Sequence, residues 1–167
     1  VEAYGQFLAG GPLGQVLAPP DPGLGQYGVN PFTGYDQAQW PFLYRGTFPK
    51  GLAPMMRVVA VDGEAWSWDV LRARLQTEAG DLMLIWEAGR ASALDKPAVS
   101  DGRDIGSVVV RRRGPAGWED ARHTVSFAFA FHAFNPTAPI HVNCAAGASG
   151  WDVEPPLACS PAASGNR

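Results

Sequence analysis

The stretch RVVAVDGEAWSW, residues 57–68, decides the fold class of this chain. A largely β-branched run precedes Asp62-Gly63, and a run with two tryptophans follows it. Asp-Gly between two such runs is a strong signal for a β-hairpin, because both residues of the tight turn must adopt positive φ. We therefore predict that Met56–Val61 and Glu64–Trp68 pair as antiparallel strands that turn at Asp62-Gly63.

The residues after this hairpin predict a helix and two further strands. Asp69 is placed to cap a helix whose apolar and basic residues fall on different faces. The run DLMLIW, Asp81–Trp86, is typical of a buried strand, and we expect it to join the sheet of the hairpin. Ile105–Arg113 predicts another strand, which leaves the core at its basic end.

A phenylalanine-rich segment near the end allows two interpretations. The phenylalanines at 127, 129 and 131 alternate as in a half-buried strand. Those at 127, 131 and 134 instead fit a helix, with Ser126 as N-cap and Asn135-Pro136 as its end. Periodicity alone leaves the choice open.

Composition favours short elements joined by many turns. Hydrophobic residues make up 46% of the 167, enough for a core, but 20 glycines and 15 prolines argue against a helical bundle. We predict a β-rich α+β fold: a small mixed or antiparallel sheet with short helices and long Gly/Pro-rich loops and arms. The expected layout is an extended N-terminal arm (1–25), a single globular β-rich domain (26–142) and an extended tail with a disulfide (143–167).

Charge and motifs exclude several classes of partner. Thirteen basic against 16 acidic residues give no reason to expect a nucleic-acid partner, and no apolar run is long enough for a transmembrane segment. His141 and Cys144 lack the second ligand pair of a metal site, and no cofactor motif is present. The basic run Arg111–Arg113 is expected to be a solvated strand end, the alternative being a docking site for an anionic lipid or protein surface.

Four residues are the candidates for catalysis: Ser92, Asp95, Asp104 and His132. With Asp36 they supply the residue types of a Ser-His-Asp hydrolase, but Ser92 lacks the Gly-x-Ser-x-Gly elbow. A purely structural role is the alternative: Ser92 would make hydrogen bonds in a turn, and His132 would be a helix or core residue. Tyr35 and Asp36 are candidates for binding, although an aspartate here also suits a turn.

Seven strings occur in the order found in the bacterial domain-of-unknown-function family 3179. They are Gly5–Gly14, Tyr27–Asp36, Pro41–Gly46, Pro54–Val61, Ala91–Asp95, Asp101–Gly106 and Phe131–Pro136. The chain resembles mainly the second half of that family, over roughly residues 1–142. It departs from the family at 114–126, where a longer strand-rich insert is usual, and it lacks the cysteine-containing first-half motif. The resemblance therefore suggests a truncated or processed member.

The resemblance implies no activity, because the family has no assigned function. Its members commonly carry export signals, so it implies a periplasmic or extracellular location, and it favours a short helix for the phenylalanine-rich segment. We expect a non-catalytic exported (periplasmic) interaction module, or an accessory subunit of a larger envelope assembly, whose partner is another protein or a membrane-associated complex. The alternative is a periplasmic hydrolase or small-molecule-binding protein, in which Ser92, Asp95, Asp104 and His132 would converge in one pocket.

Cys144 and Cys159 are predicted to form a disulfide, the alternative being two unpaired thiols in a cytoplasmic tail. They are the two cysteines of the chain and lie in a loop-rich segment, where a bond would close 16 residues and stabilise the fold by about 3 kcal/mol. Such a bond also fits an oxidising compartment. Intact mass after alkylation, with and without reductant, tests this. Alkylation of both thiols without reductant would contradict the disulfide and weaken the predicted location.

Overall fold

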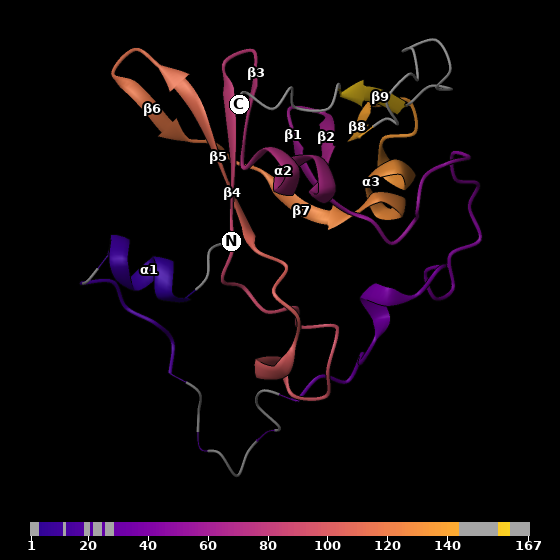
Figure 1. Ribbon diagram of the computed structural model, residues 1–167, viewed down its shortest axis with the longest axis horizontal. Helices are drawn as coiled ribbons and strands as arrows, with labels where there is room; N and C mark the ends of the chain where they lie inside the picture. Colours follow the sequence, from indigo (N-terminus) through magenta and orange to yellow (C-terminus); the bar gives the residue numbers. More distant parts are fainter. Residues whose placement is uncertain are drawn as a thin grey trace, which may run out of the picture. The chain divides into compact units, whose positions relative to one another are not determined.

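The computed structural model describes residues 4–11, 13–18, 21, 25, 29–143 and 157–160 (Figure 1). The predicted β-rich α+β class is confirmed. The elements are α1 (Tyr4–Gly10), η2 (Tyr35–Gln37), β1 (Arg57–Val61), β2 (Glu64–Ser67), α2 (Trp68–Arg74), β3 (Gln76–Ala79), β4 (Leu82–Glu87), η3 (Val99–Asp101), β5 (Ser107–Gly114), β6 (Gly117–Asp120), β7 (Thr124–Phe127), α3 (Ala128–Phe134), β8 (Ile140–Asn143) and β9 (Leu157–Ser160). Cys144, and with it the predicted disulfide, lies outside the described residues.

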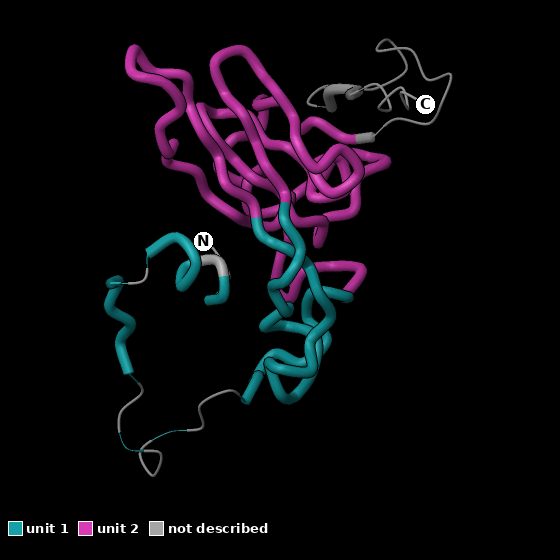
Figure 2. Tube along the Cα trace, turned by 60° about the vertical axis from the view of Figure 1, so that its left-hand side comes forward, with its two compact units in different colours: residues 1–37, 87–107 teal, residues 38–86, 108–167 magenta. Residues whose placement is uncertain are grey.

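The chain divides into two compact units (Figure 2). Unit 1 comprises Val1–Gln37 and Glu87–Ser107, and unit 2 comprises Ala38–Trp86 and Val108–Arg167. The predicted boundaries of arm, domain and tail stay predictions. Within the predicted extended arm, however, the structure has a helix, α1.

The hairpin predicted for Met56–Val61 and Glu64–Trp68 is confirmed over Arg57–Val61 and Glu64–Ser67, but Met56 lies outside the strand and Trp68 begins α2. β1 and β2 pair antiparallel, with Val58 opposite Ser67 and Val61 opposite Glu64. Asp62 has φ 52° and Gly63 has φ 83°. Positive φ at both central residues is the geometry that matches the twist of the two strands.

The hairpin lies at the centre of a five-stranded mixed sheet of order β7-β1-β2-β8-β9. β7 adds to β1 antiparallel, whereas β8 adds to β2 parallel. Successive side chains of β1 point to opposite faces of the sheet and contribute to two separate hydrophobic clusters. Val59 and Val61 pack with α2 residues and with strands of the second sheet, whereas Val58 packs with Phe131 of α3 and Ile140 of β8.

Asp81–Trp86 forms a strand as predicted, but its predicted sheet is wrong. β4 belongs to a second sheet of order β3-β4-β5-β6, where it pairs with β3 through a turn at Gly80 and Asp81. Leu82 and Leu84 of β4 nevertheless share one hydrophobic cluster with Val59 of β1. An apolar run indicates that a strand is buried. Because strands of both sheets are buried in the same cluster, the apolar pattern could not show to which sheet β4 belongs.

The cap of α2 also differs from the prediction. Ser67 is the N-cap, and its Oγ accepts a hydrogen bond from the Val70 N–H at 3.3 Å. Asp69 lies inside the first turn, where its negative charge is favourable near the helix N-terminus. The helix therefore begins two residues earlier than a cap at Asp69 would allow, directly at the end of β2.

The helical interpretation of the phenylalanine-rich segment is confirmed for residues 128–134, whereas the alternating strand is wrong beyond Phe127, because Phe129 and Phe131 lie in α3. Thr124–Phe127 is strand β7, with Phe127 opposite Arg57, and Ala128–Phe134 is helix α3, as the family resemblance favours. The N-cap is Phe127 and not Ser126. Asn135 ends the helix and its N–H reaches the Phe131 carbonyl at 2.9 Å.

Replacement of Gly63 by valine should lower the free energy of unfolding by about 1 kcal/mol or more. A Cβ there meets no atom within 4 Å, so the loss comes from the positive φ alone. Urea unfolding measures it. Gly5→Val is the control, because Gly5 also faces open space but has no positive φ. Equal effects of the two substitutions would contradict the turn geometry.

Candidate functional site

A buried polar cluster in unit 1 unites several of the sequence candidates around one arginine. We call it the Arg103 cluster: Asp36, Gln37, Ser92, Asp95 and Arg103. The Arg103 guanidinium contacts Asp36 Oδ2 at 3.1 Å and Asp95 Oδ1 at 3.2 Å. The Asp36 and Asp95 side chains are 0% and 3% exposed, whereas that of Arg103 is 45% exposed. Arg103 thus compensates two carboxylates that have been removed from water.

Serine, glutamine and backbone donors complete the cluster. Ser92 Oγ donates to Asp36 Oδ2 at 2.5 Å and accepts from the Leu94 N–H at 3.2 Å. The Gln37 amide donates to Asp95 Oδ1. The backbone N–H of Arg103 donates to Asp95 Oδ2 at 2.7 Å. Buried carboxylates need this many partners, because an unsatisfied buried charge is strongly unfavourable.

Local backbone geometry brings the parts of the cluster together. The turn that leads into η2 is held by Asn30, whose N–H donates to the Pro97 carbonyl at 2.7 Å, while the Gly34 N–H donates to the Asp95 carbonyl at 3.1 Å. On the other side, a Cβ on Gly102 would lie 2.2 Å from the Ser92 carbonyl oxygen. Only glycine at position 102 allows the strand-like segments around Ser92 and Arg103 to approach so closely.

The electrostatics favour an ionised Asp95. The hydrogen bond from the Arg103 backbone N–H lowers the pKa of Asp95 below its ordinary value, and the Arg103 charge adds to this, although burial acts in the opposite direction. An ionised Asp95 and the adjacent guanidinium form charge-assisted hydrogen bonds, the strong class in proteins. These contacts join Asp36 to the segment from Ser92 to Arg103, which lies far away in the sequence. The arrangement therefore stabilises the fold of unit 1.

The remaining sequence candidates lie elsewhere. Asp104 accepts hydrogen bonds from the backbone N–H groups of Gly89, Arg90 and Gly106, at 2.8–3.0 Å, and so fixes a turn. His132 belongs to α3 in unit 2, where the centroid of its ring lies 5.6 Å from that of Phe48 and the two rings are nearly perpendicular. Tyr35 is in η2, with its ring 6.3 Å from that of Phe32.

Sequence reasoning missed Arg103 and Gln37 as members of the cluster. Arg103 contacts Asp36, which lies 67 positions away in the sequence. No sequence signal marks a contact over that distance.

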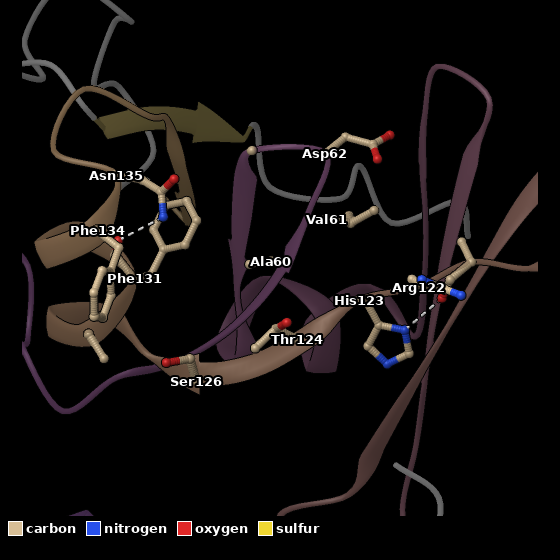
Figure 3. A pocket seen from close by; sticks show the side chains of 13 residues that line it. Ala60, Val61, Asp62, Arg122, His123, Thr124, Ser126, Phe131, Phe134 and Asn135 are labelled. Atoms are coloured by element: carbon tan, nitrogen blue, oxygen red, sulfur yellow. Dashed lines mark hydrogen bonds between the residues drawn. The ribbon is translucent and has the colours of Figure 1, made fainter.

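An open pocket of about 890 Å³ lies in unit 2 (Figure 3). Arg122 and His123 stand at one end, with Phe131, Phe134 and Asn135 of α3 at the other. His123 Nδ1 is 3.0 Å from the Ala121 carbonyl oxygen, and Asn135 Nδ2 donates to the Phe131 carbonyl at 3.1 Å. Neither Ser92, Asp95, Asp104 nor His132 lines this pocket. Within the described residues, no group of three or more His, Cys, Asp or Glu is arranged to hold a metal ion.

The basic run of β5 is largely neutralised by acidic neighbours. Arg112 contacts Asp62 at 2.5 Å and Asp81 at 2.9 Å. The hydrogen bond to Asp62 raises the pKa of Arg112. Arg111 lies 3.8 Å from Asp120, and Arg113 lies over the Trp118 ring, 4.9 Å from its centroid. This geometry supports the solvated strand end over an anionic docking site.

Neutralising Asp95 should change how stability depends on acid pH. Because the folded-state pKa of Asp95 is lowered, its stabilisation is complete above the unfolded value of about 4 and is lost as pH falls through the folded value. Asp95→Asn should therefore unfold with a flatter pH dependence below about pH 4 than the wild type. Urea unfolding across pH 2–6 would measure this.

The matched control is Asp101→Asn, which neutralises an exposed carboxylate in the same unit. It should retain the acid slope of the wild type. An Asp95→Asn variant with the wild-type slope would show that the Arg103 cluster does not stabilise the ionised carboxylate.

Comparisons with known proteins place the chain in a family without giving it an activity. No curated protein and no solved structure matches it. No helix in the described part of the chain has the length and apolar character needed to cross a bilayer. A family model does match, over residues 1–138 of 167, and its description is "Protein of unknown function (DUF3179)". A match over most of the chain shows membership, so this protein belongs to the DUF3179 family.

Proposed function

We propose that this chain is a non-catalytic interaction module, an accessory subunit that binds another protein through its N-terminal segment, residues 4–11 and 13–18. The observation that carries the proposal is the exposure of apolar side chains in this segment. Leu13 and Leu17 are 95% and 96% exposed. Tyr4, Leu8 and Val16 are exposed as well. These five side chains lie within 14 residues of sequence, and a concentration of exposed apolar side chains is typical of protein interaction sites.

The N-terminal segment has local structure that presents these side chains. After α1, the Gly11 N–H donates to the Phe7 carbonyl, and the Gly14 N–H donates to the Gly11 carbonyl, both at 2.8 Å. The Phe7 ring covers Gly14, where a Cβ would lie 2.3 Å from the ring. This local turn leaves Leu13 facing solvent. Burial of such side chains on a partner would contribute about 25 cal/mol per Å² of apolar surface.

The state of the hydrolase candidates also supports a non-catalytic role. Ser92 is 0% exposed, and its hydroxyl is committed to Asp36 and the Leu94 N–H. A nucleophilic serine needs access to substrate and a base to remove its proton. His132 packs on Phe48 in the other unit, and Asp104 is engaged by three backbone N–H groups.

The location is part of the proposal. A periplasmic or extracellular chain fits the predicted Cys144–Cys159 disulfide, and an envelope assembly would supply the protein partner. The alkylation experiment described for the two cysteines tests this part separately from the binding surface.

The binding surface is tested by affinity purification at native abundance followed by mass spectrometry. A specific protein should copurify with the wild type and not with Leu13→Ser/Leu17→Ser. Leu75→Ser is the control, because Leu75 is an exposed leucine of α2's C-cap in unit 2. Equal recovery of every partner by the double variant would contradict the proposal.

Hydrogen exchange gives a second, independent readout. Amides of residues 4–18 should exchange fast in the isolated chain and more slowly in the native assembly. Strong protection of this segment in the purified monomer would contradict a role in binding and indicate a self-contained domain.

A further inference from the structure

The loop between η2 and β1 carries a second exposed apolar surface, in unit 2. Phe42 and Leu43 are 79% and 75% exposed, and Trp40 is also exposed. We call Trp40, Phe42, Leu43 and Tyr44 the aromatic tip. It is separate in sequence from the N-terminal segment and belongs to the other unit.

The backbone of the aromatic tip is strained in a way that exposes these residues. The Tyr44 N–H donates to the Pro41 carbonyl at 3.3 Å and closes a turn. Leu43, at its third position, has φ 62°. Turns with positive φ at this position prefer glycine, and leucine is uncommon there. Strained positions of this kind persist only where the surroundings hold them, and they concentrate at functional sites.

Neighbouring contacts hold the aromatic tip in this conformation. Pro41 is fully buried. The Trp40 indole N–H donates to the Tyr44 carbonyl at 3.1 Å. The Tyr44 ring lies 5.3 Å from that of Phe129 in α3, which anchors the turn to the body of unit 2. These contacts hold the turn in one conformation, in which the Phe42 and Leu43 side chains are exposed to solvent.

The charge of the sequence segment that contains the aromatic tip favours an anionic surface as its partner. Residues 38–61 contain Arg45, Lys50 and Arg57 and no aspartate or glutamate, although the whole chain has a net charge of −3. Arg45 and Lys50 are exposed.

We propose that the aromatic tip inserts into the headgroup region of an anionic lipid bilayer, with Arg45 and Lys50 contacting lipid phosphates. Tryptophan and tyrosine favour the membrane–water interface, and phenylalanine and leucine beside basic residues are typical of interfacial anchors. Because few side chains insert, the association is peripheral and reversible. It does not depend on the protein partner of the N-terminal segment.

Sedimentation of the purified full chain with vesicles tests this. The chain should bind phosphatidylcholine vesicles that contain phosphatidylglycerol, bind phosphatidylcholine alone far less, and bind less as salt rises. Phe42→Ser and Leu43→Gly should each weaken binding about tenfold, as expected for loss of one inserted apolar side chain.

Leu43→Gly is the decisive variant, because glycine relieves the positive φ and the protein should be at least as stable as the wild type. The matched control is Leu75→Gly, which removes another exposed leucine with φ 61° and should leave vesicle binding unchanged. Leu13→Ser/Leu17→Ser should also bind vesicles normally, so this result is independent of the protein partner.

Two outcomes would overturn the proposal. One is no binding of the wild type to the phosphatidylglycerol vesicles, and the other is undiminished binding by both tip variants. If the wild type does not bind vesicles and the tip variants lose a copurifying protein, the aromatic tip is a protein-docking surface.

Discussion

The pairing of β1 with β2 through a two-residue turn is the constraint on which unit 2 depends. Because Asp62 and Gly63 both adopt positive φ, the turn leaves no freedom in register. A shift by one residue would exchange the faces of β1 and send Val58 to the side of Val59. Each side has its own cluster, one with the second sheet and one with α3, and both would lose their central residue.

Unit 1 is stabilised mainly by hydrogen bonds and ion pairs among buried polar side chains. The hydrophobic clusters among the described residues lie entirely in unit 2. In unit 1 the buried side chains include Asn30, Asp36, Ser92 and Asp95, which are polar. Their stabilisation depends on hydrogen-bond geometry, so it requires each donor at its place, whereas apolar burial tolerates substitutions of similar volume. The close approach at Gly102 is part of that geometry.

What could be predicted from the sequence was local. The hairpin between Arg57 and Ser67 carries its signal within a few residues, and so does the strand predicted at Ile105–Arg113, which the structure has at Ser107–Gly114. The sheet of β4 could not be predicted, because its apolar run suits either of two sheets that share a core. The cap at Ser67 was missed since Asp69 offers an equally good capping side chain. The Arg103 cluster joins residues that are far apart in the sequence. A single amino-acid sequence contains no signal that such residues are in contact.

The register of the central sheet has a kinetic consequence. Arg57 pairs with Phe127 and Ala65 with Ile140, so these neighbours are separated by roughly 70 positions or more of chain, a separation typical of slow folding. The β1–β2 and β3–β4 hairpins close over a few residues and can form first. The whole of Glu87–Ser107 lies inside the loop that must then close. We therefore expect the entropy of bringing β7 and β8 back to the β1–β2 hairpin to be the main part of the folding barrier.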